Sequence, residues 1–502
     1  MKKGIHALFL FGAAILLMSG AIDLDNLFNY ADQTIPAFIT KDNTPVDNPI
    51  TDEGATLGRV LFYDKMLSSD NSVSCGSCHI QEHAFSDLDT VSIGIDGNRT
   101  PRHSMRLVNA RFGEETKFRW DESAETLEEQ MIIPIKNGKE MGYSGEDGMP
   151  GFADLIAEME STSYYPPLFS IAFGDSNITE ERIQKALAQF VRSIQSFDSK
   201  YDIGRAQVTD DLTDFPNFTA NENAGKRLFM EAFQWEEDSI TVMDVPGDPG
   251  GTFLIANRVS GGFDCATCHV PPEFSIDPGS LNNGFVRPSS NFPGDPSWLD
   301  GTRSPTLRDL IKADGETLNG GMFHSGQAVH LQDIFGHYTF RRLDEVDNPN
   351  LDPRLRRVSP SSGENIAIHL NNSAMERRQL FEFLATLTGT DVYTNEKWSD
   401  PFDENGSISI IGGEITSTND LDATEHSIQV YPNPASDRIT IGGASNLSRI
   451  EIIDAAGRIQ QLIHPNGSLH TIDISSLPSG LYFIRAQHLE GKSLDIQKLV
   501  KE

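Results

Sequence analysis

The sequence has only four cysteines in 502 residues, and their placement leaves none for disulfide bonds. All four stand in two short motifs, Cys75-Gly-Ser-Cys78-His79 and Cys265-Ala-Thr-Cys268-His269. Disulfide bonds hold together many small exported domains, and that kind of framework is excluded here. The cysteines must therefore serve another purpose, and the histidine after each pair indicates which one.

Long hydrophobic runs are also missing, except at the N-terminus. Lys2 and Lys3 precede an apolar run over about residues 7–18, and small residues follow at 19–21. This pattern is typical of a secretory signal peptide, here residues 1–21, and a retained membrane anchor is the alternative. No other stretch is apolar enough to cross a membrane, which predicts export of a soluble protein to the periplasm.

Basic residues are few compared with acidic ones. Lysine and arginine total 40 against 73 aspartates and glutamates, which gives a formal net charge of −33. Such a chain would repel phosphate, so nucleic acid is excluded as a partner. The acidity has two readings: it keeps an exported protein soluble, or it attracts a basic partner such as a small basic cytochrome.

Each C-x-x-C-H motif predicts a covalently attached haem. The two cysteines are spaced to reach both vinyl groups of one porphyrin, and the following histidine then lies beneath the iron as its ligand. The chain would thus carry two haem c groups, with His79 and His269 as iron ligands. A paired zinc site or a redox C-x-x-C is the alternative. Export, the lack of disulfides and the histidine that ends both motifs favour haem.

The predicted fold is mainly α, with two cytochrome c-like haem domains packed together and a small all-β sandwich after them. The chain is too long for one ordinary core. Residues 50–215 form the first haem domain, which ends with an amphipathic helix over 180–197 capped by Thr179. Residues 216–395 form the second haem domain and repeat the same plan.

The second haem domain has clear helix signals. Thr219 and Ser373 each begin a capping box, and the helix after Ser373 is predicted to stop at Gly389. A glycine-rich, acidic stretch near 235–262 is predicted to be a surface loop.

The C-terminal part of the chain changes character twice. Residues 396–426 are polar and rich in glycine, serine and threonine, which is typical of a linker. Residues 427–502 hold short β-type runs separated by turn signals, which predicts a small β-sandwich. The runs in question are 428–431, 438–441, 449–453 and 480–485.

Residues 50–395 resemble the bacterial diheme cytochrome c peroxidase family, which includes MauG. The matching segments follow in family order and surround both haem motifs. They are 57–64, 67–68, 73–79, 119–121, 127–130, 134–142, 228–229, 265–269, 301–308 and 322–326. The resemblance implies that the first haem binds peroxide and the second accepts electrons.

The same resemblance implies roles for three further residues. Gln130 and Glu140 would line the distal face of the first haem, and Trp120 would lie between the haems as a route for electrons. The chemistry asks for such groups, because cleavage of a peroxide needs a base to move a proton and a polar group to stabilise charge. A solvated glutamate and an ordinary core tryptophan are the alternatives.

Two positions depart from the usual family pattern. The family peroxidases carry a methionine where this chain has Tyr338, and the tyrosine version resembles MauG. Tyr338 is therefore favoured as the sixth ligand of the second haem, with Met322 as the rival and simple core packing of Tyr338 as a third reading. The loop 92–101 lacks the distal histidine of resting peroxidases, and His103 aligns poorly with it. This predicts a first haem that is open and five-coordinate.

Further expectations come from resemblance alone. The family tends to hold calcium between its haem domains and to form homodimers, but Asn319-Gly-Gly321 replaces the usual Thr-x-Pro and no calcium ligand or interface is assigned. Residues 427–502 resemble the type A sorting domain of type IX secretion, which implies that machinery as a partner and the cell surface or medium as the destination. A generic binding sandwich is the alternative.

The sequence thus predicts an enzyme that reduces hydrogen peroxide with electrons from a small cytochrome or similar donor protein. A MauG-like oxidase that uses peroxide on a protein or organic substrate is the second hypothesis. A surface electron carrier without enzymatic activity is the third, and Gln130 and Glu140 argue against it.

Overall fold

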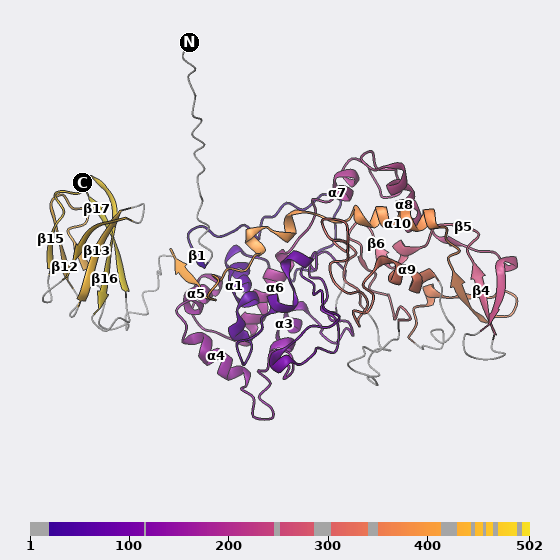
Figure 1. Ribbon diagram of the computed structural model, residues 1–502, viewed down its shortest axis with the longest axis horizontal. Helices are drawn as coiled ribbons and strands as arrows, with labels where there is room; N and C mark the ends of the chain where they lie inside the picture. Colours follow the sequence, from indigo (N-terminus) through magenta and orange to yellow (C-terminus); the bar gives the residue numbers. More distant parts are fainter. Residues whose placement is uncertain are drawn as a thin grey trace, which may run out of the picture. The chain divides into compact units, whose positions relative to one another are not determined.

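The computed structural model describes residues 20–114, 117–244, 252–285, 303–339, 350–412, 429–442, 447–454, 458–464, 470–488 and 494–501. Two compact units divide the chain, residues 1–413 and 414–502, and Figure 1 shows their helices and strands. The predicted signal peptide lies outside the described residues up to residue 19.

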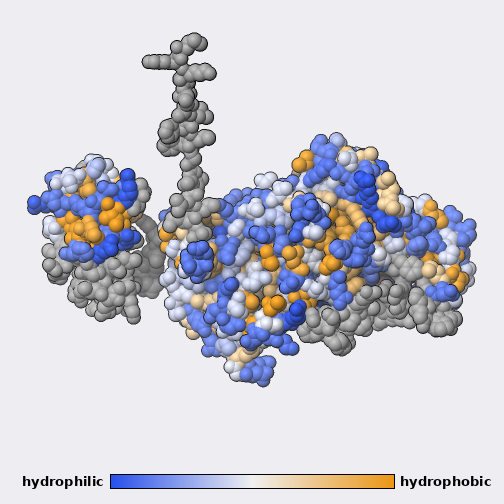
Figure 2. Space-filling model, in the orientation of Figure 1, coloured by the Kyte–Doolittle hydropathy of each residue, from blue (hydrophilic) through white to orange (hydrophobic). Residues whose placement is uncertain are grey.

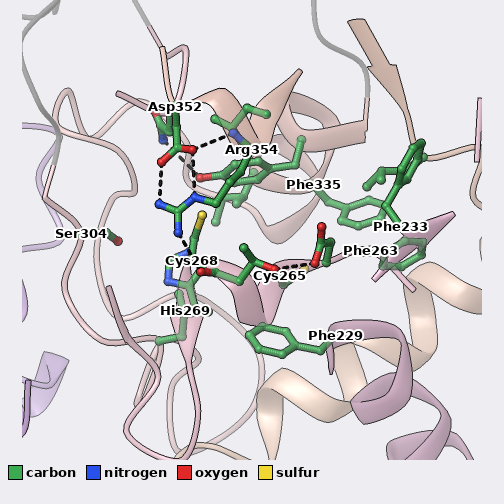
Figure 3. Close-up of a pocket in the computed structure, with 18 of the residues that line it drawn as sticks. Phe229, Phe233, Phe263, Cys265, Cys268, His269, Ser304, Phe335, Asp352 and Arg354 are labelled. Atoms are coloured by element: carbon green, nitrogen blue, oxygen red, sulfur yellow. Dashed lines mark hydrogen bonds and ion pairs between the residues drawn. The ribbon is translucent and has the colours of Figure 1, made fainter. Parts of the chain in front are cut away.

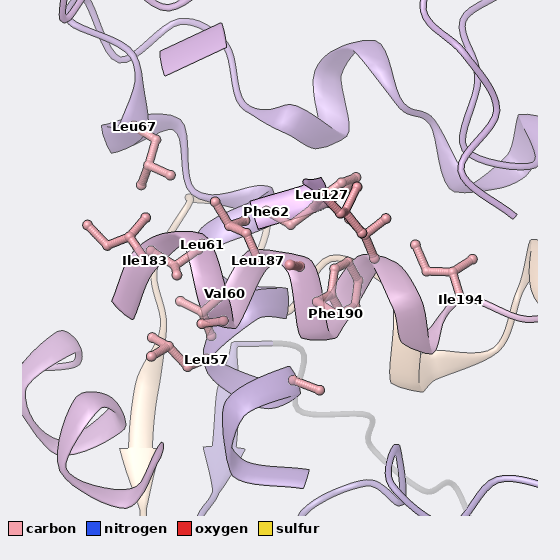
Figure 4. Close-up of a cluster of buried hydrophobic side chains, with 14 of the residues drawn as sticks. Leu57, Val60, Leu61, Phe62, Leu67, Leu127, Ile183, Leu187, Phe190 and Ile194 are labelled. Atoms are coloured by element: carbon pink, nitrogen blue, oxygen red, sulfur yellow. The ribbon is translucent and has the colours of Figure 1, made fainter. Parts of the chain in front are cut away.

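The first half of the larger unit is built around the packing of α1 (Asp52–Tyr63) against α6 (Glu180–Ser193). Thr179 caps α6 by accepting a hydrogen bond from the Arg182 N–H, as predicted. The two helices touch at Gly58, where a Cβ atom would lie only 2.0 Å from the carbonyl oxygen of Ala186. Figure 4 shows the apolar side chains that α1 and α6 bury between them.

The other helices of this half surround the pair. They are α2 (Cys75–Cys78), α3 (Leu127–Lys136), α4 (Phe152–Glu160) and α5 (Tyr165–Phe173). Both α3 and α5 contribute to the same core, with α3 packed on α6 and α5 packed on α1.

The second half repeats the close helix pair. Helix α8 (Ala220–Met230) lies against α10 (Ala374–Ala385), and the predicted capping boxes of Thr219 and Ser373 start them. A Cβ atom on Gly225 would lie 1.9 Å from the Gln379 carbonyl oxygen, so this contact also needs glycine. Helix α10 ends at Ala385, short of the predicted stop, while α7 (Lys200–Arg205) and α9 (Leu331–Thr339) complete this half.

The predicted surface loop near 235–262 is wrong. Strands β3 (Ile240–Asp244) and β4 (Thr252–Asn257) form a hairpin that joins β9 (Asn365–His369) and β8 (Arg357–Val358) in a sheet of order β3-β4-β9-β8. Local glycine content hid the β-branched residues of the strands, and the parallel pairing with β9 is a long-range contact that no local pattern announces. Three short strand pairs complete the unit. They are β2 (Phe233–Gln234) with β5 (Ser260–Gly261), β6 (His269–Val270) with β7 (Ser275–Ile276), and β1 (Ala21–Asp23) with β10 (Ser409–Ile411).

The cores divide the larger unit differently from the predicted domains. One buried cluster collects residues between 22 and 194 together with Val392, Tyr393 and Trp398, and the other collects residues between 201 and 387. The predicted linker from residue 396 is wrong over its first part: Trp398 is buried in the first cluster, and β10 pairs with β1. Apolar side chains hold this segment against the unit, whereas residues 413–428 lie outside the described ones.

The smaller unit contains two antiparallel sheets, of order β11-β12-β15 and β14-β13-β16-β17. Their strands are β11 (Gln429–Tyr431), β12 (Arg438–Gly442), β13 (Leu447–Asp454), β14 (Ile459–Ile463), β15 (His470–Asp473), β16 (Gly480–His488) and β17 (Leu494–Lys501). The four predicted runs are all strands, and buried residues of both sheets form one cluster. Figure 2 shows that apolar residues also reach the surface of this unit.

The glycine contacts give a stability test. Gly58→Ala and Gly225→Ala are each expected to destabilise the protein by about 1–3 kcal/mol, because a methyl group must displace the backbone of the facing helix. Gly336→Ala is the control: it lies exposed in α9 with no atom within 4 Å of the added carbon, so alanine should stabilise by roughly 0.5–1 kcal/mol. Thermal unfolding of the haem-loaded protein measures the difference, and equal midpoints for all three variants would contradict the packing argument.

Candidate haem sites

The first motif lies on the short helix α2, the next α-helix after α1 along the chain. The side chain of Ser77 accepts a 3.0 Å hydrogen bond from the Ser74 N–H and so helps to cap this helix. His79 directly follows α2, and Nδ1 of its ring lies 3.0 Å from the carbonyl oxygen of Phe85. A carbonyl only accepts, so Nδ1 carries the proton and Nε2 keeps the free lone pair that an iron ion needs.

A large cavity opens beside this motif. Its space, including the open mouth, is about 1560 Å³. The structure brings every residue predicted for the first haem to its wall. These residues are Cys75, Cys78, His79, Trp120, Gln130 and Glu140.

Glu140 is held by the turn that follows α3. Its Oε1 accepts a 3.1 Å hydrogen bond from Nδ2 of Asn137, and its carbonyl accepts a 3.0 Å bond from the Ile95 N–H. The loop before Trp120 passes so close that a Cβ atom on Gly94 would lie 2.1 Å from the Lys139 carbonyl oxygen. This close approach explains the glycine at residue 94 and fixes the backbone that carries Glu140.

The electrostatics of this wall suit a proton-transfer group. Burial raises the pKa of Glu140 above that of an ordinary glutamate, while the guanidinium of Arg119 lowers it. Gln130 projects from α3, and its Oε1 is buried without a hydrogen-bond partner among the described residues. A buried polar atom without a partner is uncommon, and here it faces a cavity that can hold a ligand.

Trp120 is fixed by hydrogen bonds that join the two halves of the unit. Its Nε1–H donates to the His103 carbonyl oxygen at 2.7 Å, and the His103 N–H donates to the His324 carbonyl oxygen at 2.9 Å. The Arg303 N–H in turn donates to the Trp120 carbonyl oxygen at 3.1 Å. Trp120 lines both the first cavity and a smaller cavity that also touches His269.

His103 lines the first cavity, but its ring is bound elsewhere. Nε2 lies 3.3 Å from the Ser86 hydroxyl, and Nδ1 lies 3.1 Å and 3.2 Å from the carbonyl oxygens of Asp89 and Thr90. Burial lowers the pKa of His103 to about 4, so the ring is neutral. Both ring nitrogens therefore have protein partners, and neither is free to bind a metal.

The second motif forms a tight turn ahead of β6. Nη1 of Arg354 donates to the Thr267 carbonyl oxygen at 3.0 Å, and Arg354 is itself paired with Asp352. Figure 3 shows this guanidinium between Asp352 and the cysteines of the motif. Unlike His79, His269 has a buried Nδ1 without a hydrogen-bond partner among the described residues.

The cavity beside the second motif is largely apolar. It holds about 1270 Å³ including its mouth, and phenylalanines form much of its wall, with Phe229, Phe233, Phe263 and Phe335 visible in Figure 3. Tyr338 of α9 lines this cavity, and its hydroxyl accepts a 3.2 Å hydrogen bond from Nδ2 of Asn283.

Met322 does not line the second cavity. It belongs to the wall of the smaller cavity, and its sulfur lies 3.9 Å from Nη1 of Arg106. Tyr338 and Met322 both line the smaller cavity with His269, but of the two only Tyr338 also lines the second cavity beside Cys265 and Cys268.

Sequence reasoning missed the basic side chains around these cavities. Arg106, Arg119 and Arg303 line the first cavity, and Arg106 is buried with an Nε that has no partner among the described residues. They come from separate loops, so no local motif marks them. Buried cations require anions, and the carboxylates of a haem would supply them.

The residues present therefore fit two haem groups. Each motif offers two thiols and a histidine beside a cavity of sufficient size, and the cations suit the carboxylates of the porphyrin. Attachment of a haem through two cysteines, with a histidine as iron ligand, defines a c-type cytochrome, and two such sites define a diheme one.

Comparison with known proteins narrows the class. Residues 52–208 match the family model described as di-haem cytochrome c peroxidase. A methylamine utilization protein MauG from Methylophilus methylotrophus is 34% identical over 350 residues, covering 69% of this chain and 85% of the relative. The chain belongs to the diheme cytochrome c peroxidase and MauG family, and two haems are its cofactors.

Two further relatives represent the range of that family. A cytochrome c551 peroxidase from Nitrosomonas europaea is 35% identical over 150 residues, or 30% of this chain and 42% of the relative. The crystal structure of a MauG-like protein associated with microbial copper homeostasis superposes with a TM-score of 0.52 at 26% identity. That match covers 74% of this chain and 99% of the other.

The smaller unit belongs to a different family. Residues 429–502 match the model of the secretion system C-terminal sorting domain, so this unit is a sorting domain of the type IX secretion system. In the part of the chain that the structure describes, no helix combines the length and apolar character of a membrane span.

Calcium stays a prediction. Among the described residues, no group of three or more histidine, cysteine, aspartate or glutamate side chains is arranged to hold a metal ion. Asn319, at the position of the usual threonine, donates from Nδ2 to the carbonyl oxygens of Asp309 and Ile311 and to the Tyr393 hydroxyl.

Haem attachment can be counted directly. The double variant Cys265→Ser/Cys268→Ser should retain one covalent haem, and Cys75→Ser/Cys78→Ser should retain the other, because each motif holds its haem independently. Intact-mass spectrometry of the denatured protein measures the haem number, and haem-bearing tryptic peptides identify the site. A wild-type mass without added haem, or two haems in either variant, would contradict the assignment.

Proposed function

We propose that this protein reduces hydrogen peroxide to water at the first haem site, with electrons that enter at the second. The observation that carries the proposal is the pair of partly buried side chains, Glu140 and Gln130, on the wall of the first cavity, where His103 is the one histidine besides His79 among the described lining residues and is hydrogen-bonded through its ring. A pure electron carrier has no need of a partly buried acid–base group on the wall of its haem cavity. This feature argues against the non-enzymatic alternative.

The residues of the first cavity divide the chemistry between them. A haem held by His79 supplies the iron that binds peroxide and the electrons that cleave it. Glu140 takes the proton from the inner oxygen of peroxide and returns it to the outer oxygen, which leaves as water. The carboxamide of Gln130 donates a hydrogen bond to the separating negative charge. Two electrons and two protons complete the conversion of one peroxide into two waters.

Trp120 is proposed as the residue between the two sites. It lines the first cavity and the smaller one next to His269 and Tyr338, so its ring lies on the way from one haem position to the other. Its hydrogen bond to the His103 carbonyl oxygen holds the indole in place. A small electron-donor protein outside the cell would deliver electrons to the second haem.

The second haem is proposed to be closed by Tyr338. The position of the tyrosine in the cavity wall, with its hydroxyl held by Asn283, supports this ligand over Met322. A phenolate ligand lowers the reduction potential of a haem, whereas methionine raises it. A low potential favours the second candidate function, a MauG-like oxidase of a protein or organic substrate.

The location follows from the two ends of the chain. We propose that the signal peptide directs export to the periplasm and that the sorting domain directs the chain on to the cell surface or medium. The haem sites would then meet peroxide and electron donors outside the cell.

Glu140→Gln tests the proposed base. Glutamine keeps the shape but cannot take a proton, so the rate of reaction with peroxide should fall by about 10²–10⁴-fold. Glu146→Gln, on an exposed loop nearby, is the matched control and should leave the rate unchanged. Stopped-flow mixing with peroxide measures both, and an unchanged rate in Glu140→Gln would remove its assigned role.

Tyr338→Phe and Met322→Leu separate the two candidate ligands. Phenylalanine cannot bind iron, so the absorption spectrum of the second haem should change and its reduction potential should rise in Tyr338→Phe. Met322→Leu should leave both unchanged, because Met322 does not line the cavity beside Cys265 and Cys268 and its sulfur is in contact with Arg106. Spectroelectrochemical titration records both quantities, and the reverse result would assign the iron to Met322.

A further inference from the structure

Two adjacent tyrosines near the first motif share one buried carboxylate. The hydroxyls of Tyr164 and Tyr165 donate to the same oxygen of Asp64, Oδ2, at 2.7 Å and 2.8 Å. Their ring centroids are 4.6 Å apart. Asp64 is only 7% exposed, and its other oxygen accepts a hydrogen bond from the Met66 N–H.

This cluster lies close to the first C-x-x-C-H motif. Asp64 directly follows α1, and α1 contacts both α2, which carries Cys75 and Cys78, and α5, which begins at Tyr165. Tyr165 belongs to the buried cluster against which Cys75 packs. Tyr165 is fully buried, whereas Tyr164 is partly exposed, so the pair leads from the core towards solvent.

We infer that Tyr165, Tyr164 and Asp64 form a second outlet for oxidising equivalents from the first haem, which ends at the surface on Tyr164. The inference rests on the proposed function, because the haem oxidised by peroxide is the oxidant. The substrates would be small one-electron reductants that donate a hydrogen atom, of which phenols are the simplest.

The shared oxygen of Asp64 accepts the proton that each tyrosine loses when it gives up an electron. Tyr165 gives one electron to the oxidised haem and its phenolic proton to Oδ2 of Asp64, which leaves a phenoxyl radical beside a neutral carboxylic acid. Tyr164 then gives an electron to Tyr165. Asp64 returns the proton to Tyr165 and receives the proton of Tyr164 at the same oxygen. A phenol at the surface finally restores Tyr164 with a hydrogen atom, and Asp64 releases its proton to solvent.

The protonation of the two phenols makes the carboxylate necessary. Burial, and next to it the charge of Asp64, raises the pKa of both tyrosines, so both hydroxyls are protonated. A neutral phenol that loses an electron becomes a strong acid, and it needs a base within hydrogen-bond reach. Asp64 is that base for both rings.

Two other tyrosines of this core lack one of the required features. Tyr63 is closer to the motif, since its ring would contact a Cβ atom on Gly76 at 2.5 Å, but its hydroxyl donates to the Trp398 carbonyl oxygen, which is no base. Tyr143 has a carboxylate partner, Glu158 at 3.1 Å, but no tyrosine ring in contact among the described residues. These residues supply matched controls.

The first measurement is freeze-quench electron paramagnetic resonance after the haem-loaded protein is mixed with peroxide in the absence of donor. We expect a radical signal that narrows when the tyrosines are ring-deuterated. The signal should be lost in Tyr165→Phe and in Asp64→Asn, and it should persist in Tyr63→Phe and Tyr143→Phe. Phenylalanine keeps the packing, so a loss of signal in Tyr165→Phe reports the hydroxyl and not a folding defect.

The second measurement is peroxide-dependent oxidation of guaiacol, a small phenol. Asp64→Asn and Tyr164→Phe should each lower its rate by about a hundredfold or more, while peroxide reduction with a cytochrome donor stays at the wild-type rate. A persistent radical in Tyr165→Phe, or loss of the signal in a control variant, would overturn the outlet alone. A wild-type protein that does not react with peroxide would overturn the proposed function and this inference together.

Discussion

The arrangement of the two haem sites depends on the hydrogen bonds that run through Trp120. This indole donates to the His103 carbonyl oxygen, His103 is tied to His324, and Arg303 is tied back to Trp120. These bonds join loops from both halves of the larger unit, so the two cavities cannot move independently without breaking them. The same bonds hold Trp120 on the wall of the first cavity and on the wall of the smaller cavity that also touches His269.

Those surroundings make two similar motifs unequal. The first histidine donates to the Phe85 carbonyl oxygen, which fixes its ring, whereas Nδ1 of His269 has no partner among the described residues. The wall of the first cavity includes Glu140 and Gln130, and its one histidine besides His79 among the described residues, His103, is hydrogen-bonded through both ring nitrogens. The second is walled by phenylalanines and contains Tyr338. We propose that the first site is open to peroxide and the second is closed for electron transfer.

The sequence was most informative where chemistry is local. The sequence predicted the helix caps at Thr179, Thr219 and Ser373, and it predicted the strands of the sorting domain. Each of these features depends on neighbouring residues. The hairpin β3–β4 was missed because its partner strand β9 lies far along the chain. The start of the supposed linker was misread because its polar composition hid Trp398, which packs into the first core.

The residues of the candidate site likewise include some that the sequence predicted and some that it did not. Glu140, Gln130, Trp120 and Tyr338 were singled out through a family resemblance, and the structure puts all of them on cavity walls beside the motifs. The arginines of these walls and the Tyr164–Tyr165–Asp64 cluster were not predicted, because they form only when distant loops meet. Helix ends and motifs are local properties, while cavities and shared carboxylates are properties of the fold.

The central claim concerns the number of protein ligands on each iron. The first haem iron is proposed to have one protein ligand and a free sixth position, and the second to have a protein ligand on both faces. Electron paramagnetic resonance of the resting, fully oxidised protein tests it most directly, because spin state reports the number of axial ligands. The account predicts one high-spin signal from a five-coordinate haem and one low-spin signal from a six-coordinate haem. Two low-spin signals would contradict it, since the first iron would then already hold a second protein ligand.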